Sequence, residues 1–146
     1  MNILLIHPHD IYSPLEPWTI RIISFAREFI KKGHKVKLIH FPRLDTDKKV
    51  LVAIEGIEVI PFNRKTGLFI LISNIIKMYA LAQWADIVHF QKCFYWASVP
   101  ALLVGYLAKK PLHYDWDDWE EKIYCLSNER PHWFIVLFLR LLEKWL

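Results

Sequence analysis

Short apolar runs of strand length alternate with longer amphipathic or apolar segments along this chain. The strand-like runs, each followed by a polar turn, occupy 2–7, 35–41, 57–62, 86–90 and 112–115. The helix-like segments occupy 18–32, 67–83, 96–108 and 131–146. This order predicts one α/β domain over 1–146, with a Rossmann-like, doubly wound, mainly parallel five-stranded sheet of order 3-2-1-4-5 and helices on both faces.

The helical segments differ in their hydrophobic pattern. In 18–32 a single apolar stripe is flanked by Pro17, which suits a first helical turn, and by Gly33, which suits the left-handed position after a helix. The segment 67–83 is apolar nearly all round and predicts burial on two sides. The stretch 50–55 fits either a short helix or an extra strand.

Three polar segments follow strands of this expected sheet, at 7–17, 91–95 and 115–121. Parallel strands end at one edge of a sheet, and open α/β sheets bind ligands where the strand order reverses. With the predicted order, this point lies between the first and fourth strands. The sequence therefore predicts a binding crevice there, lined by these three segments.

The composition is rich in apolar residues, at 54%, and in aromatic ones, at 15%, so we expect part of the surface to be covered. No apolar run reaches the roughly 20 residues of a membrane span. The first residues lack the basic region and cleavage site of a signal peptide. Cys93 and Cys125 form no metal-ligand pattern, which favours packing roles in a reducing compartment. We expect a cytoplasmic protein.

The net charge is +4, with basic residues gathered at the end of the first helix, at Lys31, Lys32, Lys35 and Lys37. Such residues are usually solvated. They also suit attraction to an anionic membrane surface, so peripheral binding at the inner face of a membrane is an alternative. No nucleic-acid-binding motif accompanies the charge, so we expect no nucleic-acid partner.

The first loop carries two imidazoles and a carboxylate, at His7, His9 and Asp10, at the end of a strand. This set suits a metal site or an acid–base pair. His7 and Asp10 resemble the ligand positions of a His-Pro-Asp-Asp-Glu motif in zinc-dependent sugar N-deacetylases, but His9 and Ile11 depart from it. His89 and His113 lie inside strands, where packed neutral histidines are expected. No third ligand is evident, so we predict no metal.

The densest acidic run is 115–121. Repulsion between neighbouring carboxylates raises the pKa of a carboxyl group among them, and a raised pKa suits a general base. We therefore take Asp117 as the catalytic candidate, with Asp115 and Asp118 as cleft residues. The alternative is a helix capped by Asp117 or Asp118, with Glu120 and Glu121 in its first turn.

Four more side chains bear on this crevice. Gln91 and Lys92 follow the fourth strand and are expected in the cleft. Trp116 and Trp119 flank Asp117; they suit either stacking on a sugar or packing in the core, and we expect the core. No glycine precedes Gly33, and side chains in the first loop would block the backbone approach that a phosphate-binding loop needs.

Several segments together resemble glycosyltransferase family 4. They are 2–7 (Asn-Ile-Leu-Leu-Ile-His), 31–36 (Lys-Lys-Gly-His-Lys-Val), 85–90 (Ala-Asp-Ile-Val-His-Phe) and the Lys110-Pro111 lead into the acidic turn. The match is to the amino-terminal, acceptor-side domain of these two-domain GT-B enzymes. Aligned on Lys110-Pro111, Asp117 falls where the family usually has His, and Asp118 falls at the following Asp.

The resemblance implies transfer of a hexose from a nucleotide sugar to a hydroxyl acceptor, in glycan or glycolipid synthesis, with no cofactor. In the family, a carboxyl-terminal domain binds the nucleotide sugar, and this sequence does not include it. We therefore expect the chain alone to catalyse no transfer. The alternatives are a zinc-dependent sugar N-deacetylase-like hydrolase and a non-catalytic Rossmann-like binding module.

Overall fold

The structure is a computed structural model that describes the chain except for residues 14–16, 43–55, 66, 117, 127–132 and 146. The stretch 50–55 and Asp117 therefore lie outside the described residues. In chain order, the elements are β1 Asn2–Ile6, α1 Pro17–Lys31, β2 Lys35–His40, β3 Glu58–Pro61, α2 Leu68–Trp84, β4 Ile87–Gln91, α3 Tyr95–Ala108, β5 Leu112–Asp115, α4 Glu120–Leu126 and α5 Trp133–Trp145.

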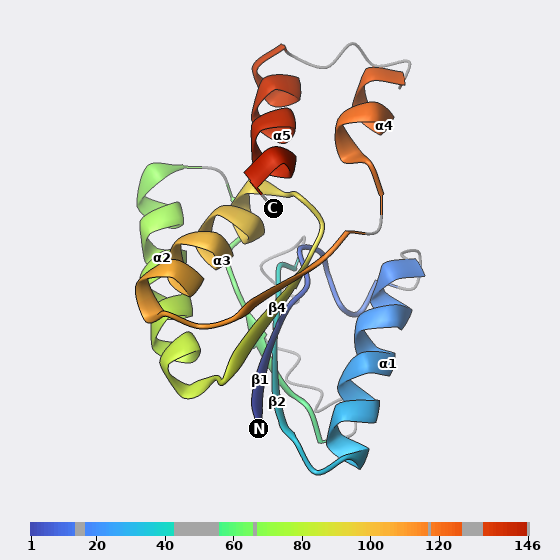
Figure 1. The fold of residues 1–146 in the computed structure, drawn as a ribbon, viewed down its shortest axis with the longest axis vertical. Coiled ribbons are helices and arrows are strands. Elements are labelled where there is room, and N and C mark those ends of the chain that lie inside the picture. Colours follow the sequence, from blue (N-terminus) through green and yellow to red (C-terminus); the bar gives the residue numbers. More distant parts are fainter. Residues whose placement is uncertain (14–16, 43–55, 66, 117, 127–132, 146) are drawn as a thin grey trace.

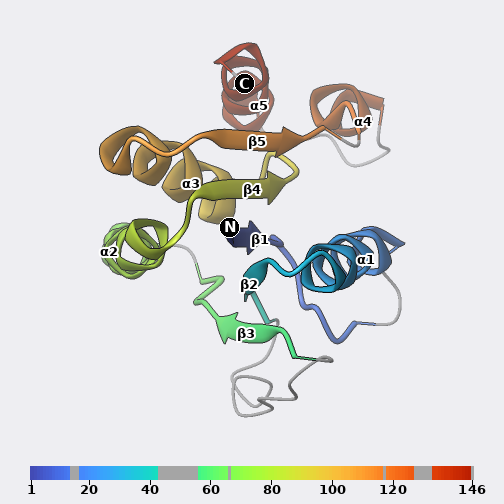
Figure 2. The same cartoon turned by 60° about the horizontal axis from the view of Figure 1, so that its bottom comes forward.

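The five strands form one parallel sheet in the order β3-β2-β1-β4-β5, as Figure 2 shows from one end. The register pairs Leu5 of β1 with Leu38 of β2 and with His89 of β4, and His89 in turn with His113 of β5. Gly33 ends α1 with a positive φ of 80°, a conformation that glycine adopts without a side-chain clash. The predicted strand order and this helix end are confirmed.

Alternating residues of the strands build two apolar cores, one on each face of the sheet. Leu5 and Leu38 pack with Ile22 and Ala26 of α1. On the opposite face, β1 and β4 pack against α2 and α3 through Leu4, Ile6, Val88, Phe90, Met78, Ala82, Ala97 and Ala101. Helices therefore cover both faces, as predicted (Figures 1 and 2).

The helix α2 is buried on one side only, so the prediction of burial on two sides is wrong. It packs on the sheet and on α3, and its buried residues are Asn74, Met78 and Ala82. Ile72 and Ile76 are exposed on its outer side. The reason is topological: no described element lies against that side, so the apolar pattern there reflects an uncovered surface.

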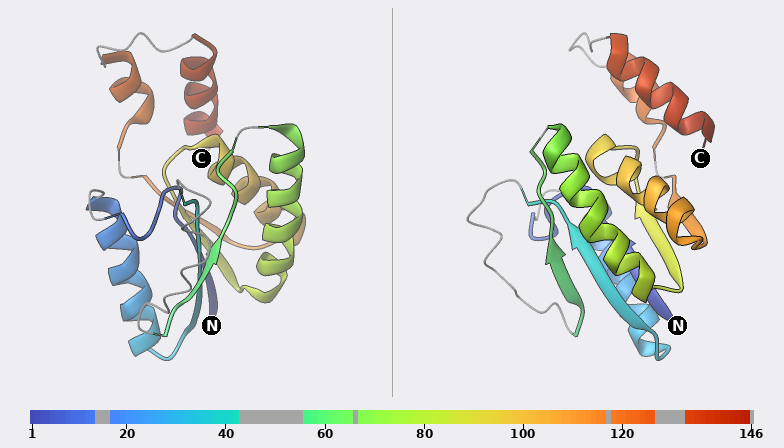
Figure 3. Two further views of the ribbon diagram at one scale, coloured as in Figure 1. Left: turned by 180° about the vertical axis from the view of Figure 1, so that it is seen from behind. Right: turned by 90° about the vertical axis from the view of Figure 1, so that its left-hand side faces the viewer.

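The two last helices lie past the carboxyl ends of the strands instead of on a sheet face (Figures 1 and 3). α4 begins at Glu120, with Glu120 and Glu121 in its first turn, as in the helical alternative for the acidic run. The cap position predicted in that alternative is wrong, because Trp119 directly precedes the helix and its backbone oxygen accepts from the Ile123 nitrogen. α5 packs Leu139 and Leu142 against Cys93. Within the described residues, no helix has the length and apolar character needed to cross a membrane.

Candidate functional site

A series of buried and partly buried polar side chains runs across the carboxyl edge of the sheet, from α1 to β5. His7 Nε2 lies 3.1 Å from the Thr19 hydroxyl, and His7 Nδ1 lies 2.9 Å from Gln91 Oε1. Gln91 Nε2 donates to Asp115 Oδ2 at 3.0 Å, and Arg21 Nε lies 3.2 Å from the same oxygen. We call Thr19, His7, Gln91, Asp115 and Arg21 the His7 network.

The donors in the His7 network follow from one another. Because the Gln91 amide nitrogen donates to Asp115, its oxygen must accept, so His7 donates from Nδ1. His7 Nε2 is then the acceptor of the Thr19 hydroxyl proton. Burial lowers the pKa of His7 to about 4, against the opposing effect of its hydrogen bond to Gln91. His7 is therefore neutral at neutral pH, with both ring nitrogens engaged.

Three of the predicted cleft residues, His7, Gln91 and Asp115, are thus brought together. Sequence reasoning did not include Thr19 and Arg21 in the site. Both lie in the first turns of α1: Thr19 contacts His7, which follows β1, and Arg21 contacts Asp115 at the end of β5. A signal for them existed: they are polar residues at the start of the helix that follows β1, and this end of the helix lies at the carboxyl edge.

Lys92 is the centre of a second polar group beside the first. Its ammonium lies 2.5 Å from Asp118 Oδ2, 3.0 Å from Glu120 Oε1 and 4.1 Å from the ring centroid of Trp18. Burial by itself lowers the pKa of Lys92, but the two carboxylates outweigh it and raise the pKa above its ordinary value. We call Lys92, Asp118, Glu120 and Trp18 the Lys92 cluster.

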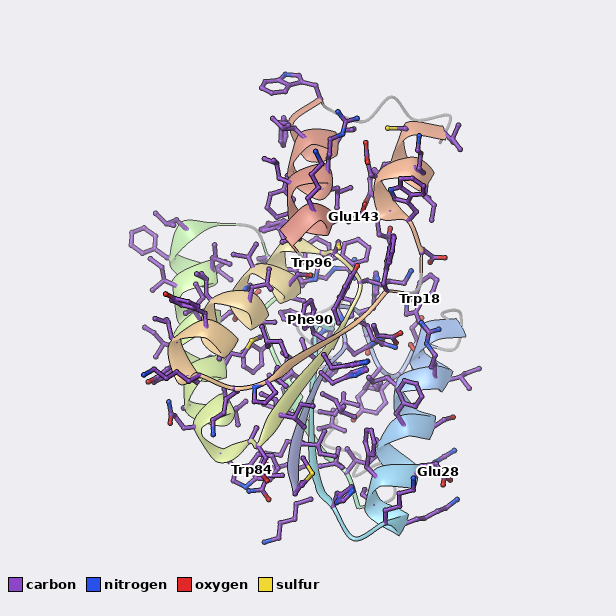
Figure 4. All side chains as sticks on the ribbon, viewed as in Figure 1. Trp18, Glu28, Trp84, Phe90, Trp96 and Glu143 are labelled. Carbon is purple, nitrogen blue, oxygen red and sulfur yellow. The ribbon has the colours of Figure 1, made fainter. Side chains whose placement is uncertain are left out.

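The Lys92 cluster joins three elements that are far apart in sequence. Lys92 follows β4 with a positive φ of 59°, Trp18 is in α1, and Glu120 begins α4. Figure 4 labels Trp18 at the upper end of α1, near the connection that leads to α4. Lys92 and Asp118 are therefore brought together as cleft residues, and Glu120 joins them. The Asp118 carboxylate binds this ammonium.

His9 and Asp10 take other partners. The His9 ring packs against Trp18 and Phe94, with centroids 5.6 and 4.7 Å away. Asp10 Oδ1 accepts a hydrogen bond from the Tyr12 backbone nitrogen at 3.0 Å and lies 3.6 Å from His40 Nδ1. His9 thus borders the Lys92 cluster through Trp18, whereas Asp10 belongs to the connection between the first loop and β2.

The zinc-ligand pattern that the sequence suggested is not assembled. Both nitrogens of His7 are engaged in its network, and Asp10 is paired elsewhere. Among the described residues, no group of three His, Cys, Asp or Glu side chains is placed to hold a metal ion. The geometry therefore gives the deacetylase alternative no support.

The tryptophans of the acidic run are exposed, so the prediction that they pack in the core is wrong. Trp116 is 62% exposed and Trp119 is 52% exposed. The run leaves β5, which is the edge strand of the sheet, and leads to α4 beyond that edge, so no described element covers these rings. Lys122 lies over the Trp119 ring, 5.2 Å from its centroid.

His89 and His113 are stacked neighbours on β4 and β5, with ring centroids 4.9 Å apart and Nδ1 atoms 2.8 Å apart. Burial, followed by the nearby His113, lowers the pKa of His89 to about 4. The prediction of a neutral packed histidine is therefore confirmed for His89. Within the part of the chain that the structure describes, its Nε2 is buried and has no hydrogen-bond partner, whereas the His113 side chain is exposed.

Together, these groups suit recognition of a polyhydroxylated ligand. The carboxylates of Asp115 and Asp118 are partly exposed, with side-chain exposures of 15% and 39%, and each is held by a cation. Held carboxylates accept hydrogen bonds from ligand hydroxyls. Trp116, between them in sequence, offers an exposed aromatic face. His7 has a structural role in the site because the lone pair of its Nε2 already accepts the Thr19 hydroxyl proton.

Comparison with known proteins informs the fold. No family model matches the sequence, and no curated protein matches it significantly. Among solved structures, the chain is similar to the crystal structure of the C-terminal domain, residues 78–226, of a hydrogenase from Pyrococcus furiosus. The TM-score is 0.50 at 14% identity, over 79% of this chain and 91% of that one. At this identity, the likeness shows the α/β fold alone.

Proposed function

We propose that this chain is the acceptor-side domain of a retaining glycosyltransferase that moves a hexose from a nucleotide sugar to a hydroxyl of a glycan or glycolipid. The observation that carries the proposal is the pair of cation-held carboxylates, Asp115 and Asp118, next to an exposed Trp116 at the carboxyl edge of the sheet. Carboxylates bind sugar hydroxyls, and an aromatic face stacks on the apolar face of a sugar ring. The resemblance to glycosyltransferase family 4 supplies the reaction class.

In this proposal the residues have separate roles. Arg21 and Lys92 hold the carboxylates of Asp115 and Asp118 in place and orient them toward the acceptor. Asp117, between these two contact positions in sequence, is the proposed catalytic residue. A further domain would bind the nucleotide sugar, and we propose neither a metal nor a cofactor. Positioning of the acceptor at the developing charge would then supply most of the rate.

The first test is binding by the full chain. Saturation-transfer NMR with methyl glycosides and disaccharides should show acceptor contacts that Trp116→Ala removes, while Tyr106→Ala, which trims an even more exposed ring on α3, leaves them unchanged. UDP-glucose and GDP-mannose should bind more weakly than the glycosides, and the chain alone should transfer no sugar. Robust transfer by this chain, or glycoside binding that Trp116→Ala leaves intact, would contradict the proposal.

The second test concerns Asp117. Once transfer is reconstituted with a donor-binding domain, Asp117→Asn should lower turnover at least tenfold, about 1.4 kcal/mol of barrier, without loss of fold. If Asp117 only stabilises the turn before α4, asparagine serves nearly as well and turnover should survive. Normal turnover in this variant would remove Asp117 from the site.

A glycolipid acceptor would bring this chain to a membrane surface, and the basic residues give that contact a testable form. Lys31 and Lys35 lie at the end of α1 and the start of β2, at the opposite end of the molecule from α4 and α5 (Figure 1). Co-sedimentation with anionic vesicles should weaken as the salt concentration rises. If no vesicles bind at low salt, this part of the proposal fails.

A further inference from the structure

An apolar pocket of about 650 Å³ lies beside the Lys92 cluster, between the starts of α2 and α3 and the helices α4 and α5. Its walls include Leu71, Trp96, Val99, Phe134 and Phe138. Figure 4 labels Trp96 at the start of α3, close to α5. The pocket is thus formed by elements from four separate parts of the chain.

The lining of the pocket defines what it can hold. Among the described residues that line it, Glu120 is the one acidic or basic side chain, and the rest are apolar, aromatic or thiol groups. Water in such a space has too few hydrogen-bond partners to be well ordered, so an apolar group displaces it favourably. The volume falls in the range of small-molecule sites.

The polar end of the pocket is the Lys92 cluster. The Glu120 carboxylate lines the pocket and accepts from Lys92 Nζ at 3.0 Å. Cys93, the next residue in the chain, also lines the pocket and is only 1% exposed. Glu120 thus belongs both to the pocket lining and to the Lys92 cluster, so a ligand held in the pocket has the Lys92 cluster at one end.

We propose that this pocket binds the hydrocarbon chain of an amphiphile whose polar end lies against the Lys92 cluster. A ligand with a single polar end fits because an apolar space ends at one ion pair. Neither a second copy of the chain nor another apolar protein segment accounts for the charged end. If the proposed function holds, the hydrocarbon chain in the pocket is the lipid tail of the glycolipid acceptor. That identification alone rests on the proposed function.

The test uses the full chain and n-alkyl β-D-glucosides from hexyl to dodecyl, below their micelle concentrations, titrated by calorimetry. Each added methylene should tighten Kd by up to about fourfold until the pocket is full, and longer chains should gain nothing more. An affinity that does not depend on chain length overturns the proposal. An affinity that rises without a plateau does so too, because it indicates partition onto exposed apolar surface.

Matched variants locate the binding. Val99→Phe fills the pocket and should weaken dodecyl glucoside at least tenfold, whereas Tyr106→Ser, an 83% exposed position on the same helix outside the pocket, should leave Kd unchanged. If Val99→Phe does not fold, Phe138→Ala enlarges the pocket and should move the plateau to longer chains. Equal effects of Val99→Phe and Tyr106→Ser overturn the proposal.

Two further measurements distinguish an amphiphile from a second copy of the protein in the pocket, and the pocket proposal from the proposed function. Sedimentation velocity that shows a dimer abolished by Val99→Phe would assign the pocket to a second copy and overturn the amphiphile. Alkyl dimethylamine oxides carry the same chains on a head group without a sugar. The same plateau with these amphiphiles supports the pocket even if glycosides without a chain fail to bind, whereas glycoside binding with no chain dependence supports only the proposed function.

Discussion

The His7 network and the apolar pocket meet at one short stretch of chain, and they differ in how they tolerate change. Gln91, at the end of β4, points to the α1 side and joins the network, whereas Cys93, two residues later, lines the pocket. Lys92 lies between them and is bound by carboxylates. In the network the donors of Thr19, His7 and Gln91 each have an assigned acceptor, so a single deletion leaves a buried group unpaired. The pocket walls face open space, which takes added or lost methyl groups at little cost.

The largest effect on stability is expected at Lys92, which lies between the His7 network and the pocket. Lys92→Met removes the cation from two carboxylates, one of which, on Glu120, is only 5% exposed. Leaving a buried charge without its partner should lower the free energy of unfolding by about 3–5 kcal/mol. Urea unfolding followed by circular dichroism measures it.

The double variant Lys92→Met with Glu120→Gln is the control. It removes the cation together with the charge that it neutralises, so it should be more stable than Lys92→Met alone. If the two variants are equally stable, Glu120 is hydrated in the native state and the Lys92 cluster does not fix α4.

Acid should affect the polar side of the sheet next. His7 and His89 both have a folded pKa of about 4, compared with 6.5 in the unfolded chain. Above pH 6.5 they contribute nothing to the pH dependence. As the pH falls from 6.5 toward 4, these histidines bind protons in the unfolded state but not in the folded state. The free energy of unfolding therefore falls by up to about 3 kcal/mol for each histidine.

His89→Phe isolates one of these contributions. The charged and titratable side chains that affect the pKa of His89 are His113, Asp115 and Arg21, and all three remain in the variant. The loss of stability between pH 7 and pH 4 should shrink by about 3 kcal/mol relative to the unsubstituted chain. An unchanged loss would mean that His89 is protonated in the native state.

Gln91→Leu tests the network against the pocket directly. The variant leaves His7 Nδ1 without an acceptor and removes a donor to Asp115, at an expected cost of about 1–3 kcal/mol. Val99→Ala, which removes two methyl groups from the pocket wall, should cost less because it widens an existing space. Thermal unfolding compares them, and an equal loss in the two variants would contradict the contrast.

The sheet was predictable from the sequence because its strands are short apolar runs between clear turns. The order 3-2-1-4-5 follows from right-handed connections, and the ends of the parallel strands correctly place Gln91 and His7 at the same edge. The burial of α2 and of Trp116 was not predictable in the same way. An apolar pattern shows that a side chain favours burial, but only the placement of the remaining elements decides whether anything covers it.

The partners within the site were harder to predict than its location. Asp118 next to an acidic first turn fits a helix cap equally well, and nothing in the local sequence indicates that Lys92, well before it in the chain, binds its carboxylate. The positive φ of Lys92 arises from the tight turn between β4 and α3, which directs this side chain toward α4. Pairings of this kind depend on where α4 lies, and short-range pattern does not encode that.

The smallest effect on stability is expected from labelling the two thiols, which tests whether Cys93 in the pocket wall is accessible to reagents. Cys125 is exposed on α4, whereas Cys93 is 1% exposed, its Sγ lies 2.7 Å from the Tyr114 hydroxyl, and burial raises its pKa to about 11. Because the thiolate is the reactive form, a disulfide reagent at mildly alkaline pH should label one thiol per chain rapidly and the other only as the chain unfolds. Labelling should leave the unfolding free energy nearly unchanged, since Cys125 faces solvent.

The two cysteine variants assign the labelling phases. In Cys125→Ser the fast phase should vanish, and in Cys93→Ala it should persist. Two fast thiols in the unsubstituted chain would show that α5 leaves Cys93 accessible, and the contrast between the His7 network and the apolar pocket would then fail on the pocket side.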